Sequence, residues 1–305
     1  MHFTVSAPAS SANLGPGFDA LGLALDLWND ITIDTDATPG EIVLLGSEAG
    51  LLDARENLSL TAMTCLAETH GRELPPFGTI VRCEVPVARG MGSSAAALVA
   101  GLVAANHLLD LGLSHEDLYA YAWRMEGHGD NVGAALYGGA VLAAPGLRRP
   151  VRLLTHEDLD LEAVVFVPKT TGATTAARAA LPPTVPHPDA AFNIAAASAL
   201  VLGLHTGDRE LIAVGMRDRL HEPYRKRLFA HLEPMTAAAR AAGALGAALS
   251  GAGPSVLALA DPAAAPAVAA AMEATAAALA TAGDVRRLRP AFGGVRVVEE
   301  VPALG

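Results

Sequence analysis

Residues 86–96, PVARGMGSSAA, combine residue types that suit phosphate chemistry. Gly90 and Gly92 permit positive φ angles and leave the backbone bare, so successive N–H groups can converge on an anion. Ser93 and Ser94 suit the N-cap of the alanine-rich stretch that follows, whose positive helix-dipole end would face the loop. A serine hydroxyl is also an oxygen ligand of the kind that Mg²⁺ prefers. The segment predicts a phosphate-binding loop, and the alternative is a tight turn into a buried helix.

A second polar group lies in residues 124–139, RMEGHGDNVGAALYGG. Glu126 and Asp130 can hold a metal, whereas His128 and Asn131 can hydrogen-bond a substrate. The alternative is a set of surface residues that cap the end of the preceding helix. Zinc is disfavoured because no third nitrogen or sulfur ligand is suitably spaced.

Two further features have polar side chains that suit a small polar ligand. Asn13 and Asp19 flank the Gly-Pro-Gly turn at 15–17, although Asn and Asp favour such turns for conformational reasons alone. Arg178 and Arg225 occur in apolar or turn contexts, and arginine binds carboxylates through two parallel hydrogen bonds. The alternative for each arginine is a solvated surface side chain.

The elements that must position these residues are strands and helices in mixed order. Strands are expected at 2–9, 31–36, 78–86, 138–144, 161–169 and 293–300, with a strand–turn–strand at 244–260. Helices are expected at 57–71, 114–127, 190–205, 208–221, 233–242 and 262–282. A cluster of Pro, Gly and Arg at 144–152 suggests a boundary. We therefore predict an α+β chain with two domains, 1–150 and 151–305.

Composition and missing motifs exclude several classes of protein. A net charge of −11 argues against a nucleic-acid surface, which needs an extended basic patch. The chain has two lysines, Lys169 and Lys226, and neither lies in a GxxxxGK[ST] motif, which excludes a P-loop. No glycine turn completes GxGxxG, which disfavours a Rossmann dinucleotide site. Two cysteines, no visible signal peptide and no apolar stretch that reaches a membrane span predict a cytoplasmic protein.

Taken together, the motifs resemble those of the GHMP small-molecule kinases. Residues 86–96 are similar to the PxxxGLGSSAA loop of that family, with Met91 in place of the usual leucine. Residues 250–259, SGAGPSVLAL, are similar to its C-terminal glycine motif. The resemblance implies the two-domain GHMP kinase fold, with an N-terminal ribosomal-protein-S5-like domain and a C-terminal ferredoxin-like domain.

Three segments resemble the branch of that family that phosphorylates L-homoserine. They are residues 7–25, residues 126–139 and residues 221–228, HEPYRKRL. Gly133 and Ala135 depart from the usual Ala and Pro of the second segment, and both changes affect the backbone of the loop rather than its polar groups.

This resemblance implies a role for each candidate residue. Catalytic roles are implied for Glu126, Ser94, Asp19 and Asn131, and substrate binding for Asn13, Asp19, His128, Asn131, Thr174, Arg178 and Arg225. ATP binding is implied for Asn57, Pro86, Val87, Ala88, Arg89, Gly90, Met91, Gly92, Ser93, Ser94, Ala95 and Ala96. Ser94 and Glu126 would hold Mg²⁺.

The implied activity is ATP-dependent phosphorylation of the side-chain hydroxyl of L-homoserine, giving O-phospho-L-homoserine, an intermediate toward threonine. A homodimer is implied as well, and neither nucleic acid nor membrane is expected as a partner. The alternatives are another GHMP kinase, such as a mevalonate-pathway member, and a catalytically inactive GHMP-fold binding protein. Whether Asp19 or Asp130 acts as a general base stays open.

Overall fold

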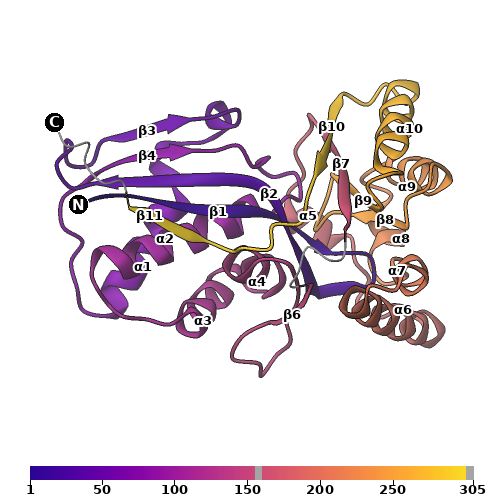
Figure 1. Cartoon of the computed structure of the whole chain (residues 1–305), viewed down its shortest axis with the longest axis horizontal. Coiled ribbons are helices and arrows are strands. Elements are labelled where there is room, and N and C mark those ends of the chain that lie inside the picture. The colour runs from indigo at the N-terminus through magenta and orange to yellow at the C-terminus, as the bar shows by residue number, and fades with distance from the viewer. Residues whose placement is uncertain (155–159, 300–305) are drawn as a thin grey trace.

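The computed structural model describes residues 1–154 and 160–299 and contains two β-sheets (Figure 1). The larger sheet has the order β11–β1–β2–β4–β3, and β5 pairs with β2 and β6 beside it. Its strands are β1 (His2–Asn13), β2 (Gly17–Asp34), β3 (Ile42–Leu45), β4 (Gly78–Arg82), β5 (Ala140–Leu142), β6 (Val151–Leu154) and β11 (Arg296–Glu299). The smaller, antiparallel sheet has the order β10–β7–β9–β8, with β7 (Glu162–Pro168), β8 (Gly246–Leu249), β9 (Val256–Ala260) and β10 (Gly283–Leu288).

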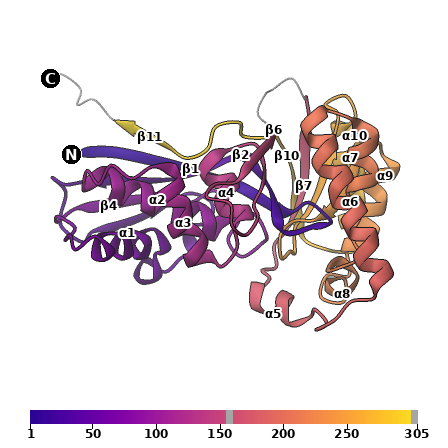
Figure 2. The ribbon, with the colours of Figure 1, turned by 90° about the horizontal axis from the view of Figure 1, so that it is seen from below.

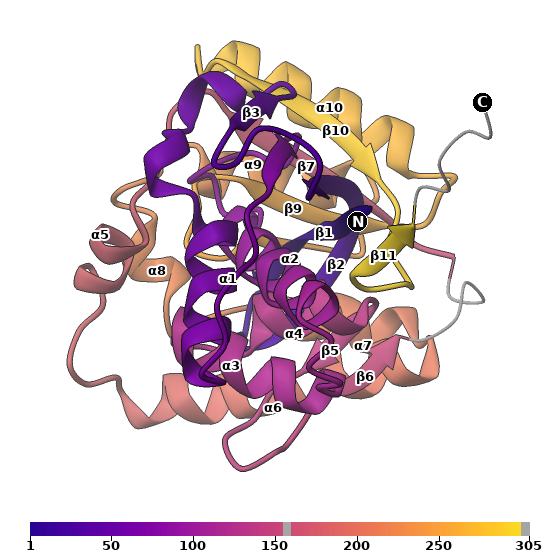
Figure 3. The same cartoon turned by 90° about the vertical axis from the view of Figure 1, so that its left-hand side faces the viewer.

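Four helices cover one face of the larger sheet (Figures 1 and 3). They are α1 (Leu58–Thr69), α2 (Ser93–Leu108), α3 (His115–Glu126) and α4 (Asp130–Tyr137), and short 3₁₀ turns at Ala49–Leu51 and Ala54–Glu56 precede them. Helix α2 is buried along most of its length, and a Cβ at Gly101 would lie 2.1 Å from the carbonyl oxygen of Ser59 in α1. The small residues of α2 therefore let it pack tightly between α1 and the sheet.

The remaining helices belong to the part of the chain that surrounds the smaller sheet (Figure 2). They are α5 (Thr174–Ala179), α6 (His187–Thr206), α7 (Arg209–Gly215), α8 (Glu222–Arg225), α9 (Leu232–Ala241) and α10 (Ala265–Ala278). Strand β7 alternates its side chains between two cores, because successive residues of a strand point to opposite faces. Val164 and Phe166 pack with α9 and α10, whereas Val165 packs with residues of α6, α7, β1 and β2. That second core joins the two sheets.

Most expected elements are present, and the differences have local causes. The helix expected at 208–221 ends at Gly215, and residues 216–221 turn back toward the 15–17 turn. A Cβ at Gly215 would lie 2.6 Å from the backbone nitrogen of Leu200, so close packing on α6 accompanies this helix end. Helix α4 and strand β10 were not expected, and β2 begins at Gly17 rather than near 31.

The division of the chain at residue 150 stays a prediction. Strands β6 and β11 both follow that residue, yet each pairs with a strand of the larger sheet. The second part of the chain thus returns to the first sheet at its end. The strand expected at 293–300 is present as Arg296–Glu299, and residue 300 lies outside the described residues.

Within the described ranges, α6 is the one helix long and apolar enough to cross a membrane by length and composition. No such stretch was expected from the sequence, so this finding corrects that expectation. The core helices of soluble proteins pass the same test, and α6 packs its buried residues against α7 and β6. Its outer side exposes Ile194 and Leu202.

Candidate active site

The glycine loop leads into α2 with three residues at positive φ, of which Ala88, at φ +54°, is the only one that is not glycine. Gly90 has φ +77° and Gly92, the N-cap of α2, has φ +68°. A Cβ at Gly90 would lie 2.2 Å from the carbonyl oxygen of Ser250, and one at Gly92 would lie 2.1 Å from Ser10 Oγ. Both glycines are therefore needed for the backbone conformation and for close packing around the loop.

The second glycine turn, residues 250–253, is bonded directly to the first. Ser250 Oγ donates to the carbonyl oxygen of Gly90 at 2.6 Å, and the Gly251 N–H donates to that of Ala12 at 3.0 Å. The two glycine motifs, about 160 residues apart in the chain, thus form one wall of a cavity. The cavity has a volume of about 430 Å³.

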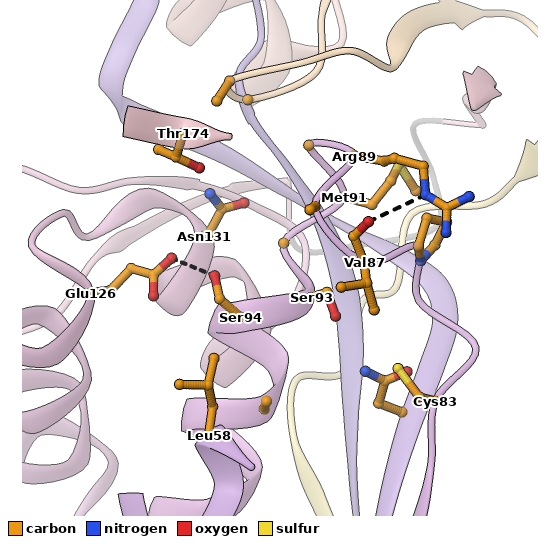
Figure 4. A pocket seen from close by; sticks show the side chains of 18 of the residues that line it. Leu58, Cys83, Val87, Arg89, Met91, Ser93, Ser94, Glu126, Asn131 and Thr174 are labelled. Carbon is orange, nitrogen blue, oxygen red and sulfur yellow. Dashed lines mark hydrogen bonds between the residues drawn. The ribbon is translucent and has the colours of Figure 1, made fainter. Parts of the chain in front are cut away.

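Ser94 and Glu126 meet at the positive end of α2. Ser94 is in the first turn of α2 and Glu126 is the last residue of α3, whose C-cap is Gly127 at φ +89°. The Ser94 hydroxyl donates to Glu126 Oε1 at 2.7 Å (Figure 4), and both residues line the cavity. A hydroxyl and a carboxylate are hard oxygen donors, so this pair fits Mg²⁺.

The start of α4 places three polar residues against the same cavity. The buried Asp130 carboxylate lies 2.6 Å from His128 Nδ1 and accepts the Asn131 N–H at 2.7 Å. Burial lowers the pKa of His128, but the hydrogen bond and charge of Asp130 outweigh it and raise the pKa overall. Ser10 Oγ donates to Asn131 Oδ1 at 2.8 Å, which leaves the Asn131 Nδ2 amino group to face the cavity (Figure 4).

Asp19 and Arg178 form a bidentate ion pair across the cavity. The two Arg178 nitrogens donate to the two Asp19 oxygens at 2.9 and 2.8 Å. Asn13 and Asp19 both have positive φ angles, and Asn13 Oδ1 accepts the Asp19 N–H at 3.1 Å. Asn13 Nδ2 in turn donates to the carbonyl oxygen of Gly251 at 2.8 Å. The turn is strained and held in place from both sides.

Arg225 is a buried guanidinium that lines the cavity, and no carboxylate of the described residues bonds it. Its side chain donates to the carbonyl oxygens of Ala177 at 3.2 Å and Gly251 at 3.1 Å. His221 Nδ1 lies 3.3 Å from its Nη1. Within residues 1–154 and 160–299, these are the hydrogen bonds of its side chain, so its positive charge can bind an anion in the cavity.

Asp19, His128 and Asp130 offer ligand atoms within 4.8 Å of one another. Each carboxylate already has a partner, because Arg178 binds Asp19 and His128 binds Asp130. The cluster is therefore better described as two adjacent ion pairs, which a ligand with both charges can join, than as a second metal site.

The cavity brings together most of the residues predicted from the sequence. All seven candidates for substrate binding line it, as do Asn57 and residues 86–94. Asn57 also caps α1 by accepting the N–H groups of Ser59 and Leu60. Ala95 and Ala96, in the first turn of α2, do not line the cavity, because both are fully buried in the hydrophobic core.

Sequence reasoning missed other residues of the cavity and its surroundings. Asn29 and Cys83 line the end of the cavity near β2 and β4, and Glu48 forms an ion pair with Arg89, which was itself a candidate. His221, fully buried, supports Arg225. Only His221 had a signal in the sequence, since it begins the HEPYRKRL segment.

Family models match both parts of the chain. The model of the GHMP kinases N terminal domain matches residues 57–139, and that of the GHMP kinases C terminal domain matches residues 196–278. The chain belongs to the GHMP kinase family. ATP is the phosphoryl donor that this kinase family implies.

Within that family, the similar curated proteins are homoserine kinases. One from Synechococcus sp. (strain WH7803) is 46% identical over 84% of this chain and 82% of its own length. Another, from Thermosynechococcus vestitus, is 43% identical over 89% of this chain and 90% of its own length. A crystal structure of homoserine kinase from Cytophaga hutchinsonii matches with a TM-score of 0.87 and 32% identity over 97% of both chains. The crystal structure of mevalonate kinase from L. major shares the fold. It matches with a TM-score of 0.70 and 19% identity over 93% of this chain and 95% of that one.

Proposed function

We propose that the protein transfers the γ-phosphoryl group of ATP to the side-chain hydroxyl of L-homoserine, giving O-phospho-L-homoserine on the route to threonine. The observation that carries this proposal is the charge pattern of the cavity. Asp19 forms an ion pair with Arg178, and Arg225, which has no carboxylate partner among the described residues, lines the same cavity, so an anion and cations are available together. A zwitterionic amino acid presents the complementary pair of charges.

The acceptor is held by its two charged groups. Its carboxylate binds Arg225 and shares Arg178, since guanidinium groups bind carboxylates through paired hydrogen bonds. Its ammonium binds Asp19, and the Asn13 and Asn131 amides together with Thr174 orient the chain that bears the hydroxyl. The hydroxyl then points toward Ser94 and Glu126, which lie on the same wall as Asn131 (Figure 4).

The nucleotide phosphates lie on the loop of residues 86–94 at the N-terminus of α2. Loop N–H groups and the helix dipole stabilise phosphate charge there without a lysine. Ser94 and Glu126 would hold Mg²⁺, which when bound neutralises charge on the phosphates. Glu126 also holds the Ser94 hydroxyl in place.

Among the described residues, neither aspartate that was a candidate general base is free. Asp130 is 1% exposed and occupied by His128 and its own helix, and Asp19 is occupied by Arg178. Phosphoryl transfer through a loose transition state depends mainly on positioning and charge stabilisation. We propose that this enzyme works by these two effects, and that the hydroxyl proton passes late in the transfer to an oxygen of the phosphoryl group. The homodimer and the cytoplasmic location stay predictions.

The test is an assay of the purified protein with ATP and Mg²⁺ against L-homoserine, L-threonine, mevalonate and galactose, with phosphorylated product measured directly. We expect L-homoserine to give the highest kcat/KM. Preference for mevalonate would favour the other GHMP branch, and no turnover of any acceptor would favour an inactive binding protein. Either result would refute the proposal.

A further inference from the structure

His221 is a fully buried imidazole between the Gly-Pro-Gly turn and Arg225. Its Nε2 lies 2.7 Å from the carbonyl oxygen of Gly15, and its Nδ1 lies 3.3 Å from Arg225 Nη1. The ring of Phe18 lies 5.4 Å from that of His221 and 5.3 Å from the Arg225 guanidinium carbon. One side chain thus links a turn of the larger sheet to a cation in α8.

The segment that carries His221 is built around the carboxylate of Asp218. This carboxylate accepts the N–H groups of Leu220, His221 and Glu222 at 3.1, 2.8 and 2.8 Å. It also accepts Asn193 Nδ2 of α6 at 2.9 Å. These bonds explain why residues 216–221 depart from the expected helix, and they fix the place of the imidazole.

The two hydrogen bonds of the His221 ring, beside which Asp218 Oδ2 lies 3.8 Å from Nε2, allow one protonation state. A backbone carbonyl such as that of Gly15 only accepts hydrogen bonds, so Nε2 carries the proton. A guanidinium such as that of Arg225 only donates, so Nδ1 must present its lone pair. The imidazole is therefore neutral when both bonds are made.

We infer that His221 is a positioning residue, which holds the Arg225 guanidinium and the 15–17 turn in the arrangement that binds the acceptor carboxylate. It touches neither substrate nor nucleotide and acts through Arg225. The inference rests on the proposed function, because that function assigns the carboxylate to Arg225.

Protonation of His221 would break this arrangement, since it would place an N–H on Nδ1 against the N–H of Arg225. Burial lowers the pKa of His221 below 6.5, Arg225 lowers it further, and the charges of Asp218 and Asp19 oppose the shift. The neutral form therefore persists at neutral pH and is lost only as the pH falls through this lowered pKa. We expect the KM for homoserine to rise along that acidic limb.

The test compares wild-type protein with the variants H221N, H221Q and H221A between about pH 5 and about pH 8, where histidine titrates. H221N retains an acceptor near the place of Nδ1, and H221Q retains a donor near that of Nε2. H205N replaces an exposed histidine of α6 and is the matched control. Steady-state KM and kcat are measured for homoserine and for ATP, and thermal unfolding shows that each variant is folded.

We expect H221A to raise the homoserine KM by about tenfold or more at neutral pH, the effect of losing a hydrogen bond to a charged group. H221N should restore most of that loss and H221Q less, with the ATP KM unchanged throughout. The acidic rise in KM should be absent from H221N and retained in H205N. Glu222, whose pKa burial raises to about 7, is present in every variant, so a limb that it causes would remain in all of them.

An unchanged KM in H221A, equal loss in H221A and H221N, or an acidic limb that survives in H221N would each overturn the inference. If H221A does not fold, the comparison of H221N with H221Q and the pH profile of H221N decide the question. A wild-type protein that does not phosphorylate homoserine refutes the proposed function as well, whereas an active wild type with any of the three results above refutes only the role of His221.

Discussion

The two ends of the cavity are built in different ways. The phosphate loop of the proposed nucleotide end is one continuous segment, residues 86–94, which leads directly into α2, and Asn57 and Glu126 join it from the ends of α1 and α3. The acceptor end is assembled from five separate segments, which contribute Asn13 and Asp19, His128 and Asn131, Thr174 and Arg178, Arg225, and the 250–253 turn. The main motif of the first end is therefore local in the chain, although the 250–253 turn packs against it, whereas the second end has no local motif and needs both sheets.

The two ends also differ in how their charged groups are balanced. At the acceptor end Arg178 pairs with Asp19 and His128 with Asp130, while no carboxylate in the described part of the chain bonds Arg225. At the nucleotide end Glu126 is bonded only to the Ser94 hydroxyl among the described residues. A substitution at the acceptor end should mainly change binding, and one at Glu126 should mainly change turnover.

The largest effect is expected for Glu126→Gln. The amide keeps the shape and can still accept the Ser94 hydroxyl, but it removes the negative charge that fits Mg²⁺. We expect kcat to fall by about 100-fold or more, the size typical of a lost electrostatic element in a transition state. Steady-state kinetics measure this, with Glu273→Gln on the exposed side of α10 as the matched control. A fully active Glu126→Gln protein would refute the metal role.

Arg225→Ala should separate the two ends most clearly. Loss of hydrogen bonds from a charged donor corresponds to roughly 10- to 100-fold weaker binding, so the homoserine KM should rise by that factor. The KM for ATP should stay unchanged, because the hydrogen bonds that the described residues give the Arg225 side chain do not include residues 86–94. Arg227→Ala, an exposed arginine two residues away, is the control. Equal increases in both KM values would show that the ends are not independent.

A smaller effect is expected at the first turn of α2. Ser94→Ala removes the hydroxyl that bonds Glu126, whereas Ser93→Ala leaves that bond intact. We expect the Mg²⁺ concentration for half-maximal rate to rise by about tenfold in Ser94→Ala, the effect of one charge-assisted hydrogen bond, and little in Ser93→Ala. Titration of Mg²⁺ at saturating ATP distinguishes the two, and identical curves would contradict the assignment of Ser94.

The smallest effect is a pH-dependent contribution of His128 to stability. Its pKa is raised in the folded protein, so its pairing with Asp130 stabilises the fold fully below the unfolded value of 6.5. This contribution is lost as the pH rises through the raised pKa. The difference in Tm between wild type and His128→Asn should thus be a few degrees at about pH 6 and smaller at about pH 9. A difference that grows with pH would contradict this pairing.

The contrast between the two ends also explains what the sequence could predict. Gly90, Gly92 and the serines after them are neighbours in the chain, so their conformation and their chemistry follow from local rules. Asn13 and Arg225 lie more than 200 residues apart, and both bond the Gly251 carbonyl. No local rule predicts this contact, and these residues could be assigned to one site only by resemblance to a family.

Other features were missed because tertiary contacts decide them. Residues 216–221 have the composition of a helix but wrap around the Asp218 carboxylate instead. Ala95 and Ala96 follow the glycine loop directly, yet the rotation of α2 points them into the core. In the first case tertiary contacts overrode helix propensity, and in the second the packing of α2 overrode adjacency to the glycine loop.

The central claim is that the acceptor end recognises a zwitterion, with Arg225 bound to its carboxylate. The most direct test compares L-homoserine with 3-amino-1-propanol, which lacks the carboxylate, in wild type and Arg225→Ala. We predict that removing the carboxylate lowers kcat/KM by about tenfold or more in the wild type and has little further effect in the variant. The same loss from removing the carboxylate in both proteins would contradict the claim.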